Sequence, residues 1–297
     1  MNHYFRPTVL RDALDALTAS PRTILAGGTD LYPRAANAEA WGEPGFTHPR
    51  AAPILDLSAV DELSQIGEYE NRYEFGACVT WSQLLKADLP PWMRCLQLAA
   101  KEVGGPQIQN RATIAGNLCN ASPAADGVPA LIALSAQVRL LRVGPNGQIS
   151  ERELDISEFI KGNGRTALAG DELVSAILIP KAPAQSRSTF LKLGARRYLV
   201  ISIVMVAVYL ETKHDTIVRA RITVGSCSEV AARLYELEAR VEGARLCDTA
   251  MLLGPSDLDP LTPIGDIRAS APYRRASALE LLRRSFLALS EDPQARL

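Results

Sequence analysis

Two short glycine-containing segments carry residue types that suit phosphate binding. The first is ILAGGTDL at Ile24–Leu31, and the second is TIAGNLCNASPAAD at Thr113–Asp126, about ninety residues later. Glycine lets the backbone approach a ligand closely, and consecutive backbone N–H groups can form a nest that binds an anion. Two such segments converging within one domain would hold a dinucleotide diphosphate from both sides. The sequence contains neither a GxxxxGK[ST] loop nor a GxGxxG fingerprint, so we expect backbone and hydroxyl groups, not a single lysine, to hold the phosphates.

Within the first segment, each residue type suggests a different contact. Gly27 and Gly28 are expected to present N–H groups to a phosphate, and Thr29 adds a polar contact. The carboxylate of Asp30 would repel a phosphate, so we expect it to cap the helix that follows. A plain strand–turn–helix with a glycine-rich turn is the alternative interpretation, and the second segment favours ligand binding over it.

The elements that must position these segments are a mixture of strands and helices. Apolar patterning predicts a strand over Arg22–Ala26 that enters the glycine pair, and Thr80 is expected to cap a short helix. Further strands are expected at Ile54–Leu57, Arg72–Val79, Gln137–Val143, Gln148–Leu154, Thr189–Lys192, Ile201–Glu211 and Ile217–Val224, and further helices at Pro91–Val103, Val128–Leu134, Ala231–Val241 and Pro272–Leu287. Runs of strands followed by helices indicate an α+β fold.

Five segments, in the same order, resemble the FAD-binding medium subunit of the molybdenum hydroxylases, the family of xanthine dehydrogenase, carbon monoxide dehydrogenase and 4-hydroxybenzoyl-CoA reductase. They are AGGTDL, TIAGNLCNASPAAD with GVPALIAL after it, FIKGNGRTALAGDELVSAILIP, FLKLGARRYLVISIVMVAV and DIRASAPYRRASALELL. The resemblance implies a two-lobed FAD-binding domain of the molybdopterin dehydrogenase or vanillyl-alcohol-oxidase-like type, followed by a smaller α+β domain with an antiparallel sheet and helices. We expect the first domain at 1–180, with lobes at about 1–57 and 58–180, a linker at 181–188, and the C-terminal domain at 189–297.

The resemblance also implies which residues bind FAD. The expected set is Ile24, Leu25, Ala26, Gly27, Gly28, Thr29, Asp30, Leu31, Thr113, Ile114, Ala115, Gly116, Asn117, Asn120, Asp126, Val174 and Lys192. Thr113, Gly116 and Asn117 would contact the diphosphate, and Val174 would lie by the isoalloxazine ring. The family usually has a glycine where this chain has Ala115, so the backbone contact is expected to differ there.

Three of these assignments have alternatives that the sequence leaves open. Asp126 would accept a hydrogen bond from a ribose hydroxyl, as carboxylates do in other dinucleotide sites, or it caps the helix near Val128. Lys192 would stabilise the reduced anionic flavin, or it is a solvated lysine at a strand edge. Tyr198 would cover one face of the ring, or it is a half-buried strand residue. Cys119 is the one cysteine expected near the flavin.

The composition narrows the classes of function. The 297 residues carry a net charge of −1, which gives no basic footprint for nucleic acid. The longest apolar run, Leu199–Leu210, is shorter than the ~20 residues a membrane-spanning helix needs, and its Val and Ile content indicates a buried strand. With no apolar signal core at the amino terminus, we expect a soluble, cytoplasmic protein. Five scattered cysteines without a CxxC pair argue against disulfides, a zinc site or an iron–sulfur cluster in this chain.

The sequence therefore predicts an oxidoreductase subunit with FAD as its cofactor and no catalytic residue or metal of its own. The resemblance implies a large partner subunit with molybdopterin, a small partner subunit with [2Fe–2S] clusters, and an external electron acceptor or donor. Trp41, Phe46 and Pro49 are candidate partner contacts. A self-contained flavin oxidase of the same fold and an assembly subunit without FAD are the alternatives.

Overall fold

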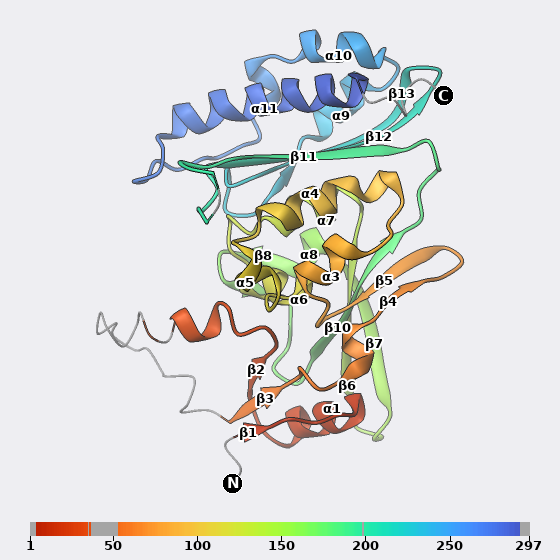
Figure 1. Cartoon of the computed structure of the whole chain (residues 1–297), viewed down its shortest axis with the longest axis vertical. Helices are drawn as coiled ribbons and strands as arrows, with labels where there is room; N and C mark the ends of the chain where they lie inside the picture. Colours follow the sequence, from red (N-terminus) through yellow and green to blue (C-terminus); the bar gives the residue numbers. More distant parts are fainter. Residues whose placement is uncertain (1–3, 35, 37–52, 198, 292–297) are drawn as a thin grey trace.

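Three sheets follow one another along the long axis of the computed structural model, with helices packed between and around them (Figure 1). The structure describes residues 4–34, 36, 53–197 and 199–291. The predicted α+β class is confirmed, because the two larger sheets are antiparallel and most helices lie outside any strand–helix–strand crossover.

The smallest of the three sheets contains the amino-terminal strands. Its order is β1-β3-β2, and both pairings are parallel. The strands are β1 (Tyr4–Phe5), β2 (Thr23–Leu25) and β3 (Ile54–Asp56), with helix α1 (Leu10–Ala19) between the first two. The first glycine segment leaves the end of β2 and leads into helical residues 31–34. This arrangement is the strand–turn–helix expected from the sequence.

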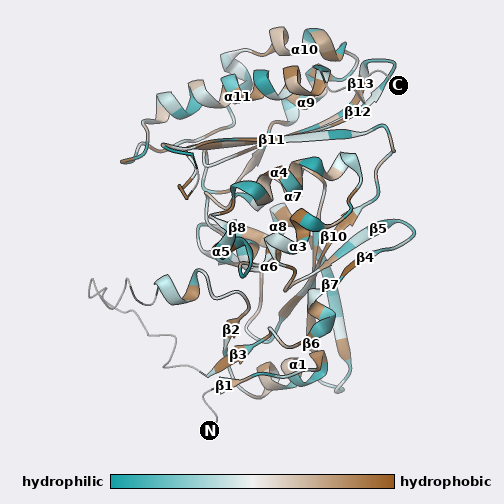
Figure 2. Cartoon of the chain, viewed as in Figure 1, coloured by the Kyte–Doolittle hydropathy of each residue, from teal (hydrophilic) through white to brown (hydrophobic). Residues whose placement is uncertain are grey.

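The second sheet has five antiparallel strands in the order β4-β5-β10-β6-β7. Its strands are β4 (Ile66–Glu68), β5 (Arg72–Gly76), β6 (Gln137–Val143), β7 (Ile149–Asp155) and β10 (Leu173–Pro180). The helices beside it are α3 (Trp81–Lys86), α4 (Arg94–Glu102), α5 (Pro106–Gln109), α6 (Ile114–Asn120), α7 (Gly127–Ala133) and α8 (Ile156–Phe159), with short 3₁₀ turns η2 (Asp61–Ser64) and η3 (Pro91–Met93) and a hairpin of β8 (Ile160–Gly162) and β9 (Arg165–Thr166). All seven residues of α7 are buried, and it is apolar over nearly its whole length (Figure 2).

Thr80 begins α3 with the expected cap. Its hydroxyl accepts a hydrogen bond from the Gln83 N–H at 3.2 Å, and the Gln83 side chain accepts one from the Thr80 N–H at 2.8 Å. The two bonds form a capping box, which satisfies N–H groups that the first turn leaves free. Other boundaries differ from the prediction: Ala232 and Arg233 form a short strand, so the helix expected from Ala231 starts at Tyr235.

The third sheet is antiparallel in the order β11-β12-β13-β14. Its elements are β11 (Arg187–Leu193), β12 (Val204–Lys213), β13 (Thr216–Gly225), β14 (Ala232–Arg233), α9 (Tyr235–Val241), α10 (Leu246–Leu252), η4 (Pro255–Leu258) and α11 (Ala271–Glu291). Arg187 and Ser188, expected in the linker, pair with β12 and are buried.

Side chains of β12 alternate between two hydrophobic cores. Val204, Val206 and Val208 pack with α9, α10 and α11, whereas Met205, Ala207 and Tyr209 face the first part of the chain. Helix α4 lies against β11, and α7 lies against β12 and β13. A strand that is buried on both faces explains the long apolar run, because successive side chains point to opposite faces.

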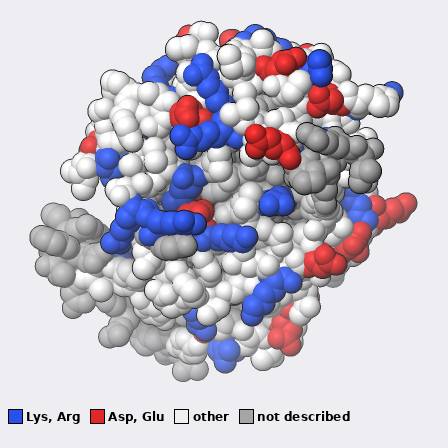
Figure 3. Space-filling view, turned by 45° about the horizontal axis from the view of Figure 1, so that its top comes forward, with Lys and Arg blue, Asp and Glu red and all other residues white. Residues whose placement is uncertain are grey.

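The surface charge is unevenly distributed although the net charge is only −1. On the face shown in Figure 3, Lys and Arg side chains gather across the middle, while most acidic side chains lie toward the upper part and the right edge. Within the described ranges, no helix is long and apolar enough to cross a lipid bilayer.

Candidate functional site

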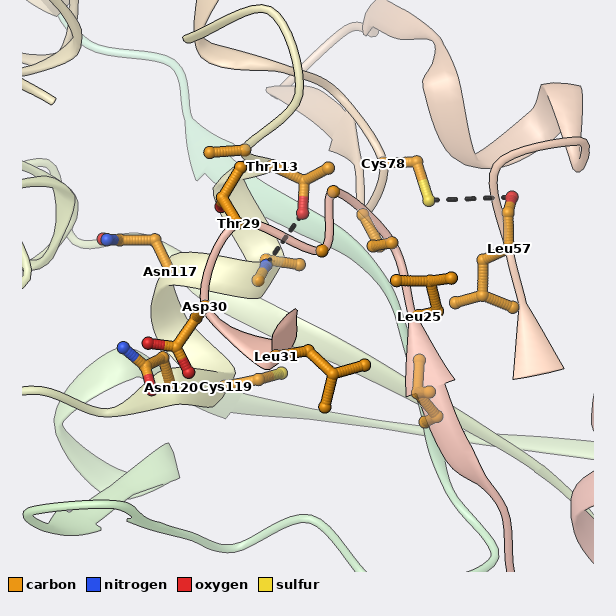
Figure 4. A pocket seen from close by; sticks show the side chains of 18 of the residues that line it. Leu25, Thr29, Asp30, Leu31, Leu57, Cys78, Thr113, Asn117, Cys119 and Asn120 are labelled. Atoms are coloured by element: carbon orange, nitrogen blue, oxygen red, sulfur yellow. Dashed lines mark hydrogen bonds between the residues drawn. The ribbon is translucent and has the colours of Figure 1, made fainter. Parts of the chain in front are cut away.

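A pocket of about 490 Å³ lies where the end of β2, the start of α6 and the start of β10 meet (Figure 4). Its volume falls within the range typical of small-molecule and cofactor sites. The described residues that line it are Ile24, Leu25, Ala26, Gly27, Gly28, Thr29, Asp30, Leu31, Arg34, Leu57, Ala77, Cys78, Trp81, Val103, Ile108, Ala112, Thr113, Ala115, Gly116, Asn117, Cys119, Asn120, Leu168, Leu173 and Val174. The whole first glycine segment and six residues of the second, all between Thr113 and Asn120, therefore line one pocket.

The two segments meet through their backbones. A Cβ atom built on Gly27 would lie 2.1 Å from the carbonyl oxygen of Arg111 and 2.9 Å from the Cα atom of Ala112. Those two residues directly precede Thr113. Only a residue without a side chain fits at this contact, so Gly27 is required by the approach of one segment to the other.

The first segment has unused hydrogen-bond donors. Gly28 has a φ of +72°, a left-handed conformation that glycine adopts without steric cost. Its carbonyl accepts from the Tyr32 N–H at 3.3 Å, so the turn closes onto the helical residues after it. Among the residues the structure describes, none of the N–H groups from Gly27 to Leu31 donates to a protein acceptor. Five consecutive donors beside a pocket, without an acceptor in the described ranges, form a site suited to an anion.

The second segment begins a helix that was not among those predicted from the sequence. Thr113 is the N-cap of α6, and its hydroxyl oxygen accepts from the Gly116 N–H at 3.0 Å (Figure 4). The Ile114 N–H donates to the Val79 carbonyl at 2.9 Å. Ala115 lies inside the helix, so the methyl group there causes no backbone strain. The Thr113 hydroxyl proton remains available to a ligand, because the bond to Gly116 uses only the oxygen.

Polar side chains gather at one end of the pocket. Asp30, Asn120, Asn117 and Thr29 all line the pocket, and Figure 4 draws them toward the same side of the view. The Asn117 side-chain oxygen accepts from the Gly127 N–H at 3.3 Å, which fixes the amide and ties α6 to α7. Asp30 makes no helix-capping bond in the described chain, although its carbonyl accepts from the Arg34 N–H at 2.9 Å.

The other lining groups are mainly apolar and include two cysteines. Burial raises the pKa of both the Cys78 and the Cys119 thiols to about 12, so both stay protonated at neutral pH. Cys119 was expected near the cofactor, and it does line the pocket. Trp81 lines the pocket, but its indole N–H is shielded from solvent and has no partner among the described residues.

Asp126 and Lys192 do not line this pocket but form an ion pair close to it. The Lys192 ammonium donates to the Asp126 carboxylate at 2.8 Å and to the Glu102 carbonyl at 3.1 Å. The Ser202 hydroxyl donates to the other Asp126 oxygen at 2.5 Å. The pair adjoins the pocket through its neighbours in sequence. Glu102 precedes Val103, which lines the pocket, and Asp126 precedes Gly127, whose N–H donates to the lining residue Asn117.

Both open alternatives for this pair are wrong. The Lys192 side chain is only 4% exposed, so it is not a solvated lysine at a strand edge. The Asp126 side chain makes no cap bond to α7. Burial raises the pKa of Asp126, and the Lys192 charge with the Ser202 hydroxyl counteracts that rise.

Arg34 is a charged pocket residue that was not predicted from the sequence. It is exposed and follows Asp30 by one helical turn. The signal available from the sequence was the i, i+4 spacing of Asp30 and Arg34. Tyr198, expected by the flavin ring, and the candidate partner contacts Trp41, Phe46 and Pro49 lie outside the described residues.

Comparison with known proteins matches both parts of the chain. A model of the FAD binding domain in molybdopterin dehydrogenase covers residues 1–182, and the CO dehydrogenase flavoprotein C-terminal domain covers residues 189–289. The FAD-subunit of nicotinate dehydrogenase from Eubacterium barkeri is 34% identical over 208 residues, which is 68% of this chain and 66% of that protein, so the match spans just under two thirds of that relative. The nicotine 6-hydroxylase medium subunit of Paenarthrobacter nicotinovorans is 28% identical over 96% of this chain and 95% of its own.

The solved structures agree. Reconstituted CO dehydrogenase from Oligotropha carboxidovorans contains a chain that superposes with a TM-score of 0.82 at 26% identity, covering 99% of this chain and 98% of that one. The family matches and the fold thus define a flavoprotein subunit of a molybdopterin-dependent oxidoreductase. The chain belongs to the family of the FAD-binding medium subunits of these dehydrogenases. The resemblance, the fold and the class of function predicted from the sequence are confirmed.

Proposed function

We propose that the pocket between the two glycine segments holds FAD with its diphosphate against residues Gly27–Leu31 and the start of α6. The observation that carries this proposal is the run of five backbone N–H groups without a protein acceptor in the described chain. Such a run compensates a diphosphate without a lysine, since partial positive charges and hydrogen bonds act together. The Thr113 hydroxyl proton adds a further donor.

The proposed contact residues are those expected from the sequence. They are Ile24, Leu25, Ala26, Gly27, Gly28, Thr29, Asp30, Leu31, Thr113, Ile114, Ala115, Gly116, Asn117, Asn120, Asp126, Val174 and Lys192. Of these, Ile114, Asp126 and Lys192 lie outside the pocket lining. Gly116 would contact the cofactor through its exposed Cα, because its N–H already serves the Thr113 cap.

FAD, when bound, supplies a carrier that takes up and releases one or two electrons. This chain's residues then bind and orient it, and the apolar wall around Leu25, Leu57 and Val174 excludes water from it. We assign the Lys192 ammonium to the polar edge of the ring system, where a positive charge favours the reduced form. Asp126 holds that ammonium in place and keeps lone pairs for a hydroxyl of the cofactor.

We further propose that the chain works between partners. A large subunit with molybdopterin would carry the substrate chemistry, and a small subunit with [2Fe–2S] clusters would relay electrons to or from this flavin. An external acceptor or donor would complete the circuit. The support is that similar chains are named as FAD-subunits and medium subunits of dehydrogenases and hydroxylases. A cytoplasmic location stays a prediction from the sequence.

Purification of the natively expressed chain tests the proposal. We expect it to elute with two other polypeptides, with molybdenum and iron in the complex, and we expect the isolated chain to bind FAD in preference to FMN. FMN lacks the diphosphate and adenosine that the glycine segments would hold. Equal affinity for the two flavins would overturn the proposed binding mode. A metal-free protein that turns over an organic substrate alone would indicate a self-contained oxidase, and a colourless complex that takes up no FAD would indicate an assembly subunit.

A further inference from the structure

The helical turn after the first glycine segment places a cation at the pocket. The Arg34 N–H donates to the Asp30 carbonyl at 2.9 Å, which fixes Arg34 one turn beyond Asp30. Side chains at this spacing lie on the same face of a helix. Both residues line the pocket. The position of Arg34 is therefore set by the glycine segment itself.

Arg34 and Asp30 are the charged side chains of the pocket. Every other described lining residue is neutral. The two do not pair with each other, and no described residue forms an ion pair or a hydrogen bond with the Arg34 guanidinium. Arg34 is exposed, so the cation is hydrated and available to a ligand. The pocket thus holds one positive charge that the protein leaves uncompensated within its described part.

On the basis of the proposed FAD function, we propose that Arg34 binds the diphosphate of FAD. The backbone N–H groups of the glycine segment supply only partial charges, and the Asp30 carboxylate opposes an anion at the same end. A guanidinium one turn away offsets Asp30 and offers paired N–H groups that match two phosphate oxygens. Arg34 therefore gives the phosphate site a full charge in addition to the backbone donors.

This role of Arg34 predicts which ligands lose affinity when Arg34 is replaced, and how that loss depends on salt. Ligands with a diphosphate depend on Arg34, whereas riboflavin does not, because riboflavin has no phosphate. Loss of one charged hydrogen-bonding partner corresponds to about a tenfold weaker binding of FAD, or more. An exposed cation is screened by salt, so its contribution falls as ionic strength rises. Replacing Asp30 should have the opposite effect to replacing Arg34.

The test uses the full chain freed of flavin, as wild type, R34Q, R34K and D30N. R11Q serves as the matched control, because Arg11 is an exposed arginine of α1 that pairs with Asp15 and does not line the pocket. Binding of FAD and riboflavin is followed by flavin fluorescence at low and high salt, and ADP is titrated as a competitor. Circular dichroism verifies that each variant is folded.

We expect R34Q to weaken the binding of FAD and ADP about tenfold at low salt, with a smaller effect at high salt. The affinity of R34K should lie between those of R34Q and wild type, and D30N should bind FAD more tightly than wild type. R11Q and all riboflavin titrations should match wild type. Wild-type FAD affinity in R34Q, or an equal loss for riboflavin, would overturn the role of Arg34 alone. A wild-type chain that binds no FAD would instead overturn the proposed function.

Discussion

The Lys192 ammonium lies 2.8 Å from the Asp126 carboxylate and so joins strand β11 of the C-terminal sheet to the residue that precedes α7. The two side chains are 4% and 11% exposed. The Glu102 carbonyl and the Ser202 hydroxyl complete the hydrogen bonds of the pair. Two buried charges that compensate each other connect the C-terminal sheet to the start of α7.

Removing the cation should destabilise the fold. K192M leaves the Asp126 carboxylate buried without its partner, and we expect the free energy of unfolding to fall by about 3–5 kcal/mol. Urea unfolding of K192M, D126N and the double variant measures the coupling between the residues. The double variant should be less destabilised than the sum of the single ones. K181M is the control, because the exposed Lys181–Glu68 pair at 2.8 Å should contribute less than about 1 kcal/mol. Equal losses in K192M and K181M would contradict the buried pair's importance.

Replacing Gly28 should reduce FAD binding by more than its effect on the stability of the fold explains. G28A forces a Cβ into a φ of +72° and to within 2.8 Å of the Tyr32 ring, which must shift together with the segment's N–H groups. We expect a stability loss of about 1 kcal/mol and loss of most FAD. Gly147 offers a matched control, with a φ of +75° and no atom within 4 Å of a built Cβ. G147A should lose similar stability and keep its flavin. Flavin content and urea unfolding of both variants decide between a binding role and a turn residue.

The Thr113 hydroxyl should serve the helix and the cofactor together. T113V removes the acceptor for the Gly116 N–H and the proton that a phosphate would accept. The lost cap should cost about 1 kcal/mol of stability, and FAD binding should weaken about tenfold. T113S keeps the hydroxyl and should resemble wild type in both respects. Calorimetric titration with FAD and thermal unfolding measure the two effects separately. FAD affinity in T113V equal to that in T113S would show that the hydroxyl only caps α6.

Asp266 should make the fold sensitive to acid. The Arg268 N–H donates to its carboxylate at 2.9 Å, and the Arg274 guanidinium donates at 2.9 Å from α11. The Arg268 backbone bond and the Arg274 charge lower the pKa of Asp266 from 3.8 to about 2. Because the folded state favours the charged form, the carboxylate stabilises the fold above pH 3.8, and this contribution is lost as the pH falls through about 2. The stability difference between wild type and D266N should therefore be constant near neutral pH and vanish near pH 2. A difference independent of pH would contradict this linkage.

Local sequence patterns predicted the elements that depend mainly on interactions between residues close in sequence. The strand–turn–helix at the first glycine segment, the Thr80 cap and the buried helix α7 follow from turn residues, capping groups and apolar periodicity. Helix α6 was missed because Gly116 and two asparagines have low helix propensity, and its N-cap and packing override that preference. The sequence did contain one signal for this helix, because threonine is a favoured N-cap residue and Thr113 directly precedes the first residue of α6.

Long-range pairings were beyond the reach of these patterns. Asp126 and Lys192 are 66 residues apart, and nothing local requires one to face the other. Gly27 was expected to approach a phosphate, whereas its missing side chain is already needed by the Arg111 carbonyl. Arg34 entered the site because the turn after the glycine segment directs it there. Each depends on how distant segments pack.

Strand β12 lies between two hydrophobic cores, so each half of the chain has apolar side chains that only the other half covers. A fragment that stops before β11 would expose the apolar faces of α4 and α7, and a fragment that starts there would expose Phe190, Met205 and Tyr209. A protease that cuts the exposed stretch Lys181–Gln185 should therefore yield a nicked protein whose two pieces stay together through gel filtration and melt in a single step.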